Sequence, residues 1–335
     1  MGPNGKCTNC LPKDDPNSVE VPKRRCKNHG IHGSCVECIE WRESLKMKLK
    51  SQDKPVCPGV SVQVNAANVF QQYIRDRKFE EQRIGYLYGN FLQDGSVSVD
   101  VIYEPPQKGD KKTATLLEDK TIDRIESLAS MLGMCRVGWI FSHPTRKYVM
   151  SSTDIIQAAN FQNTFGKSFV TLIMTTNSEG STSLEAFQVS DQALKLEKTE
   201  EFLPNQPDPA TCKLKSPVFV EGAETVTADN NFFIVTVPVK GEEKSRFNTV
   251  FPVSNRTPQT SNQDLVSYKM DSSDNTRLAF FSDFHFLVFL LTNNIFTNTD
   301  FPIICDSIKS KSSSSLDLYN EIIDAQVGEL IGHNN

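Results

Sequence analysis

The placement of the cysteines is the feature that most restricts how this chain can fold. Six of its nine cysteines lie within the first 57 residues. Four residues there follow the pattern Cys26-x2-His29-x5-Cys35-x2-Cys38, and ligands two residues apart let one tight loop face a tetrahedral ion. A segment so short and so poor in apolar residues cannot fold on buried surface alone. The spacing therefore predicts a structural zinc ion held by these four side chains.

A second, incomplete zinc motif precedes the first. Cys7 and Cys10 are separated by two residues, which supplies two of the four ligands that a structural zinc ion takes. Either the sequence begins within a finger, or His32 or Cys57 completes the set. His32 also competes with His29 for the first site, although the Cys-x2-His spacing favours His29. The later cysteines are expected to be thiols without a metal role: Cys135, Cys212 and Cys305.

Charge divides the chain at the end of this cysteine-rich segment. Residues 1–54 carry eleven Lys or Arg against seven Asp or Glu, whereas the remainder carries 25 against 34. Basic residues at 23–25 and at alternate positions from 46 to 50 suggest nucleic-acid binding as one alternative, but the positive excess is modest for that class. No apolar run approaches the ~18 residues of a transmembrane helix. We therefore expect no nucleic-acid partner and no membrane insertion.

Beyond residue 55 the apolar pattern changes repeatedly between the period of a helix and that of a strand. Such interleaving predicts a mixed α/β (α+β) fold with a packed sheet. The Pro-rich stretch 203–209 reads as a domain boundary. Helices are expected at 41–49, 68–80, 122–131, 152–161, 284–292 and 316–331, and strands at 84–89, 97–101, 137–141, 169–174 and 184–189.

Three regions follow from these patterns. They are a zinc-finger region at 1–54, an α/β domain at 55–205 and a mixed α/β C-terminal domain at 206–335. Twelve of the 21 phenylalanines fall between 219 and 301, more than one helix pair can bury. We expect most of these rings to be core and some to line a surface shared with the sheet.

One constellation resembles the catalytic site of JAMM metalloproteases, whose pattern is His-x-His-x7-Ser-x2-Asp with a glutamate on an upstream strand. His143, Ser151 and Asp154 keep that spacing. Phe141 stands where the first histidine is needed, and Gln82 stands at the position of the glutamate. A phenyl ring cannot ligate a metal, and a neutral amide cannot act as the general base. We expect a vestigial site and no enzyme activity; the alternative is a zinc-dependent JAMM-type ubiquitin isopeptidase.

Several short motifs together resemble the nuclear protein localization protein 4 family. The matching stretches follow the order of that family along nearly the whole chain. They are GPNGKCTNCLP at 2–12, YEPPQ at 103–107, RVGWIF at 136–141, FQVSDQ at 187–192 and SDFHFL at 282–287.

The resemblance implies an adaptor rather than an enzyme. It implies zinc fingers, a catalytically inactive MPN domain and a C-terminal domain, with an unfolded ubiquitin held between the last two. The implied partners are polyubiquitinated substrates, a hexameric AAA ATPase of the valosin-containing protein type and a ubiquitin fusion degradation protein. The implied setting is protein degradation, including the ER-associated route, in the cytoplasm and nucleus and at the cytosolic face of the ER or nuclear envelope.

Overall fold

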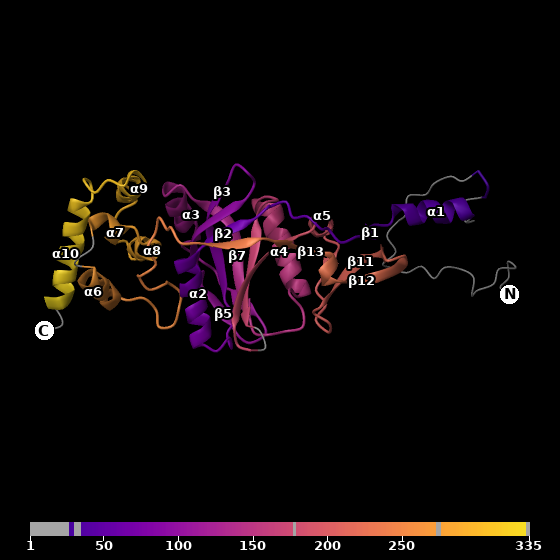
Figure 1. Cartoon of the computed structure of the whole chain (residues 1–335), viewed down its shortest axis with the longest axis horizontal. Helices are drawn as coiled ribbons and strands as arrows, with labels where there is room; N and C mark the ends of the chain where they lie inside the picture. Colours follow the sequence, from indigo (N-terminus) through magenta and orange to yellow (C-terminus); the bar gives the residue numbers. More distant parts are fainter. Residues whose placement is uncertain (1–26, 30–34, 177–178, 273–275, 333–335) are drawn as a thin grey trace, which may run out of the picture.

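The computed structural model describes residues 27–29, 35–176, 179–272 and 276–332. Figure 1 shows an elongated molecule with a large β-sheet unit in the middle. A group of helices near the C-terminus forms one end, and a small second sheet and an N-terminal helix lie toward the other. The predicted mixed α/β class is confirmed.

Eight strands form the central sheet, and it contains every strand that the sequence predicted. Neighbouring strands follow the order β13-β9-β8-β7-β3-β4-β2-β14. The hairpin between β3 and β4 turns at Asp94-Gly95, where Asp94 Oδ1 accepts the backbone N–H of Ser96 at 2.9 Å and Gly95 has a φ of 84°. The strands are β2 (Val60–Gln63), β3 (Ile84–Phe91), β4 (Val97–Tyr103), β7 (Cys135–His143), β8 (Val170–Thr176), β9 (Thr182–Val189), β13 (Ile234–Val237) and β14 (Val239–Glu242).

One extended segment connects the two edges of this sheet. β13 pairs antiparallel with β9, whereas β14 pairs parallel with β2. Only Pro238 separates β13 from β14; it has no N–H to donate, and its carbonyl accepts the N–H of Val60 at 2.8 Å. The sheet therefore extends past the boundary expected at residues 205–206, because sheet pairing brings 234–242 back to strands formed much earlier in the chain.

Helices cover both faces of the sheet. Phe70 and Ile74 of α2 (Val64–Asp76) belong to one core, and α4 (Ser152–Phe165) and α5 (Asp191–Lys198) contribute to another. α2 begins and ends four residues earlier than the pattern predicted. Lys78 and Phe79 leave the helical conformation with φ values of 56° and 55°, and Phe79 is thereby buried. The predicted helix α3 (Ile122–Met131) is present.

A second sheet lies beside α4 and α5. β11 (Thr211–Val220) pairs with β10 (Phe202–Leu203), β12 (Ala223–Asp229) and the two-residue strand β1 (Lys48–Leu49). The short helix expected from Trp41 to Leu49 is α1 (Val36–Leu45), and Leu49 instead enters β1. The buried side chain of Leu49 belongs to the core that includes residues of α4. A small hairpin, β5 (Gln107–Gly109) and β6 (Ala114–Leu116), and a 3-10 turn, η1 (Asn230–Phe232), complete the strand-rich part.

The C-terminal part is helical. It contains α6 (Asn262–Asp271), α7 (Arg277–Phe281), α8 (Phe284–Thr292), α9 (Asp300–Ser310) and α10 (Asp317–Gly332). α8 has the bounds expected from the sequence, and Asp283 caps it by accepting the backbone N–H groups of His285 and Phe286. Ten of the twelve rings between 219 and 301 are buried, and the half-buried pair is Phe219 and Phe232. None of the helices in the described ranges has the length and apolar content of a membrane span.

Candidate functional site

His143, the last residue of β7, is held as a neutral side chain. It is buried, and its Nδ1 lies 2.7 Å from the carbonyl oxygen of Pro144. This contact makes Nδ1 the donor. Nε2 has no hydrogen-bond partner among the described residues. Burial, together with the positive charge of Arg146, lowers the pKa of His143 to about 4. The ring therefore stays uncharged near neutral pH.

Ser151 and Asp154 form a helix cap instead of a catalytic pair. Ser151 precedes α4, its Oγ accepts the N–H of Asp154 at 3.2 Å, and Asp154 Oδ2 accepts the N–H of Ser151 at 2.8 Å. The same carboxylate oxygen receives Nη2 of Arg146 at 2.8 Å. A guanidinium thus supplies the positive charge that a metal ion would otherwise bring to Asp154, and the carboxylate is engaged in structural contacts.

Phe141 and Gln82 lie in the same neighbourhood but lack the required chemistry. Phe141 is buried, and its ring centroid is 4.9 Å from that of Trp139 and 6.0 Å from that of His143. Gln82 immediately precedes the residues that pair with the end of β7, and its Nε2 donates to the carbonyl of Lys111 at 3.2 Å. The neighbouring Glu81 points to Arg77, 3.1 Å away. In the parts of the chain that the structure describes, His143 and Asp154 belong to no group of three potential metal ligands.

A group suited to a metal ion forms near the N-terminus. The ligand atoms of His29, Cys35 and Cys38 all lie within 4.8 Å of one another, and His29 Nε2 is 3.1 Å from Cys38 Sγ. Ligands at ~2.0–2.3 Å from one tetrahedral zinc ion have separations of this order, so the donor set fits zinc. The predicted ligands Cys26, Cys7 and Cys10, and the alternative His32, lie outside the described residues. Cys57 is in the sheet core, where its thiol donates to the carbonyl of Gly59.

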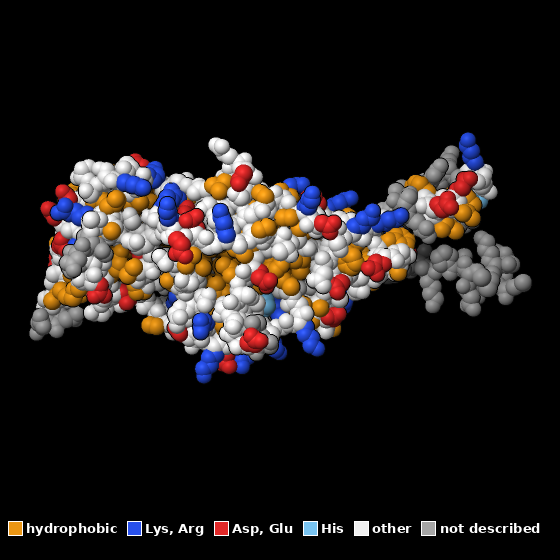
Figure 2. All heavy atoms as spheres, in the orientation of Figure 1, with side chains coloured by type: hydrophobic (Ala, Val, Ile, Leu, Met, Phe, Trp, Pro, Cys, Tyr) orange, Lys and Arg blue, Asp and Glu red, His pale blue; other side chains and the backbone are white. Residues whose placement is uncertain are grey.

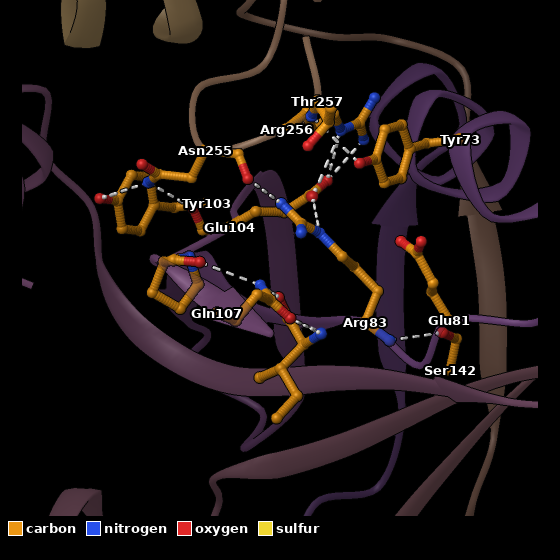
Figure 3. Close-up of polar contacts among 12 residues, drawn as sticks. Tyr73, Glu81, Arg83, Tyr103, Glu104, Gln107, Ser142, Asn255, Arg256 and Thr257 are labelled. Carbon is orange, nitrogen blue, oxygen red and sulfur yellow. Dashed lines mark hydrogen bonds and ion pairs between the residues drawn. The ribbon is translucent and has the colours of Figure 1, made fainter. Parts of the chain in front are cut away.

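A buried carboxylate joins the sheet to the segment that leads into the C-terminal helices (Figure 3). Glu104, the residue directly after β4, is 1% exposed, and its carboxylate accepts hydrogen bonds from Nε of Arg83 at 2.6 Å and Nε of Arg256 at 3.1 Å. Burial alone would raise the pKa of Glu104, but the two arginines outweigh it and hold the pKa below its ordinary value. The three side chains form an internal ion cluster, which we call the Glu104 cluster.

Backbone contacts extend the Glu104 cluster into a connection between distant segments. Arg83 Nη2 donates to the carbonyl of Asn255 at 2.6 Å, and Asn255 Nδ2 donates to the carbonyl of Glu104 at 2.9 Å. The ring of Tyr73 lies 4.3 Å from the Arg256 guanidinium (Figure 3). Gln107 donates to and accepts from the backbone of Ile84, each at 2.7 Å. The YEPPQ motif contains Glu104 and Gln107, whereas no local pattern in the sequence marks Arg83 or Arg256.

The fold and these sites define a mixed α/β protein in which His29, Cys35 and Cys38 could hold a metal ion and Asp154 is engaged in internal contacts. A model of the NPL4 family matches residues 83–158 and 227–327. The nuclear protein localization protein 4 homolog of Dictyostelium discoideum is 67% identical over 335 residues, covering 99% of this chain and 58% of that protein. NPL4-like protein 2 of Arabidopsis thaliana is 30% identical over 282 residues, covering 80% and 68%.

The human nuclear protein localization protein 4 homolog is more distant, at 26% identity over an alignment of 404 positions that covers 93% of this chain and 66% of that protein. The chain belongs to the NPL4 family, and the resemblance drawn from its motifs is confirmed. It spans 58% of the length of the Dictyostelium relative.

Proposed function

We propose that this chain is a non-catalytic adaptor that recruits polyubiquitinated proteins and delivers them to a hexameric AAA ATPase unfoldase. It acts as a heterodimer with a ubiquitin fusion degradation protein, in the cytoplasm and nucleus. Membership in the NPL4 family carries the proposal, because this is the role that the sequence resemblance implies. In this assignment residues 1–54 are the zinc-finger region and the eight-stranded unit is an inactive MPN domain. That domain includes β13 and β14, and the helices after it are the C-terminal domain.

We propose that the chain has no isopeptidase activity, because the carboxylate of Asp154 already accepts hydrogen bonds from other groups of the protein. Asp154 Oδ2 is shared by Arg146 and the cap of α4, and Phe141 cannot replace a histidine ligand. Purified protein supplied with zinc should leave ubiquitin chains uncleaved. Zinc-dependent cleavage that Asp154→Ala abolishes would show instead that the site is catalytic.

The zinc ion is proposed to hold the N-terminal region in a shape that can contact the ATPase. His29, Cys35 and Cys38 are within ligand distance of one another, and Cys26 is the proposed fourth ligand. Cys7 and Cys10 are proposed to begin a second finger. The ion would supply folding energy to a region with little core of its own.

An unfolded ubiquitin segment is proposed to lie at the junction of the sheet unit and the C-terminal helices. Val250 supports this position because its side chain is 71% exposed while its backbone N–H is fixed to Asp283 Oδ2 at 2.7 Å. An apolar side chain on an anchored backbone can bury the apolar residues of an extended chain. Covering one valine stabilises a complex by ~1.5 kcal/mol, or about tenfold in affinity.

A capture experiment tests the adaptor proposal. The chain of residues 1–335, mixed with its proposed heterodimer partner, should bind Lys-linked polyubiquitin and the ATPase hexamer at the same time. Val250→Asp should weaken ubiquitin binding about tenfold and leave ATPase binding unchanged. Val226→Asp, on the exposed edge strand β12, is the matched control and should change neither. Equal binding by both variants would contradict the junction site, and failure to capture either partner would contradict the adaptor role.

A further inference from the structure

A basic and aromatic depression lies beside β1. Figure 1 shows β1 on the side of the sheet unit away from the C-terminal helices. The depression has a volume of about 670 Å³. Lys48, Lys50, Phe219 and Phe232 line it together with Glu221 and Gly222. Figure 2 shows basic side chains gathered along this margin of the molecule. Lys48 and Lys50, two of the alternating lysines at 46–50, are therefore part of a concave surface.

The backbone that presents the two lysines is held on both sides. β1 pairs parallel with β11 through Lys48↔Phe219. On the other side, Gln192 Nε2 donates to the carbonyl of Lys48 at 2.7 Å, and Gln192 Oε1 accepts the N–H of Lys50 at 2.9 Å. Side chains two residues apart in an extended segment point the same way. Lys48 and Lys50 are thus displayed together, at fixed spacing, over the depression.

The charges in the depression are unbalanced. Neither Lys48 nor Lys50 takes part in the ion pairs found within the described ranges, whereas nearby Lys46 pairs with Glu224 at 2.5 Å. Glu221 provides one opposing carboxylate at the turn between β11 and β12. Phe219 and Phe232 are each only half-buried and add apolar surface to the lining, and Lys46 Nζ lies 5.4 Å from the centroid of the Phe219 ring. Two lysines that line the same depression as two aromatic rings form a surface complementary to carboxylates that flank an apolar side chain.

We propose that this depression docks an acidic segment of a partner protein, with an apolar residue resting on Phe219 and Phe232 and carboxylates facing Lys48 and Lys50. A protein segment fits better than a nucleic acid because the depression has only two lysines, close together. A nucleic-acid backbone would need a longer groove lined by basic residues. The site lies apart from the junction around Val250. The proposal for this depression would therefore stand even if the proposed ubiquitin site were wrong.

The test uses the full chain and a fluorescein-labelled twelve-residue peptide in which aspartates and glutamates surround one central phenylalanine. Fluorescence anisotropy should show binding that weakens as salt rises. The double variant K48E/K50E should lower affinity at least about tenfold, because two attractive pairs become repulsive. Glu221→Gln should raise affinity about twofold. The double variant K213E/K215E, which reverses two exposed lysines on β11 outside the depression, is the matched control and should bind like the unaltered chain.

Three results would overturn the proposal. An equal loss in the two charge-reversed variants would show only general attraction between opposite charges. Unchanged binding of a peptide whose phenylalanine is replaced by serine would remove the role of the aromatic rings. Tighter binding of a twelve-nucleotide uridine RNA than of the acidic peptide, lost in K48E/K50E, would assign the surface to nucleic acid.

Discussion

Replacing Glu104 by glutamine tests how the sheet is joined to the C-terminal helices. Glu104→Gln keeps the shape of the side chain but removes the charge that Arg83 and Arg256 share. The side chains of these arginines are only 9% and 13% exposed, so water cannot replace the carboxylate. Removing one partner from a buried ion pair costs about 3–5 kcal/mol. The glutamine oxygen still accepts one hydrogen bond, which places the expected loss near the lower end, at ~3 kcal/mol.

Urea unfolding followed by the fluorescence of Trp139 measures this loss. Trp139 is 3% exposed in β7, and its Nε1 donates to Thr171 at 2.8 Å, so its emission reports the sheet core. The matched control is Glu80→Gln, whose partner Lys111 lies 2.9 Å away on the surface, and it should leave the unfolding midpoint unchanged. Combining Glu104→Gln with Arg256→Met should restore part of the lost stability, because the uncompensated charge is removed.

A loss below ~1 kcal/mol for Glu104→Gln would refute the reasoning. It would mean that solvent reaches the Glu104 cluster and that the carboxylate is worth no more than a surface pair. The reasoning would also be refuted if adding Arg256→Met to Glu104→Gln lowered stability further, because the two substitutions would then act independently. Because the pKa of Glu104 is lowered, its stabilisation is present above its ordinary pKa of ~4.5 and is lost as pH falls through the folded-state value.

Three further changes test other parts of the structure. In the unfolded chain His143 has an ordinary pKa near 6.5, whereas in the folded protein its pKa is about 4. The free energy of unfolding should therefore fall by up to ~1.4 kcal/mol for each pH unit as the pH is lowered from 6.5 to 4. His143→Gln should reduce this pH dependence by one proton, and an unchanged pH dependence would contradict the prediction. Asp283→Ala should cost more than ~2 kcal/mol, because four backbone N–H groups, those of Val250, Phe251, His285 and Phe286, lose their acceptor; a smaller loss in urea unfolding would refute this. Cys35→Ser should abolish zinc binding measured by elemental analysis while leaving the Trp139 transition in place, and zinc retained at full occupancy would exclude the proposed ligand set.

The sequence alone was sufficient to predict the elements whose signals are local. The strands expected at 84–89 and 97–101 are β3 and β4, which the Asp94-Gly95 turn joins, and the helix expected at 284–292 is α8, which Asp283 caps. These features depend on residues a few positions apart. The family was also recognisable from short motifs, and the replacements Phe141 and Gln82 were visible without any structure because they concern the chemistry of single side chains.

The tertiary structure decided which distant segments meet. No local pattern indicates that 234–242 pairs with both β9 and β2, and the sheet therefore continues beyond the Pro-rich stretch at 203–209 that predicts a domain boundary. Likewise, Arg146 meets Asp154, and Arg256 meets Glu104 from 152 positions away. Strand pairing and the pairing of buried charges depend on residues that only the complete fold brings together. The spacing of residues along the chain therefore does not show which residues will be partners.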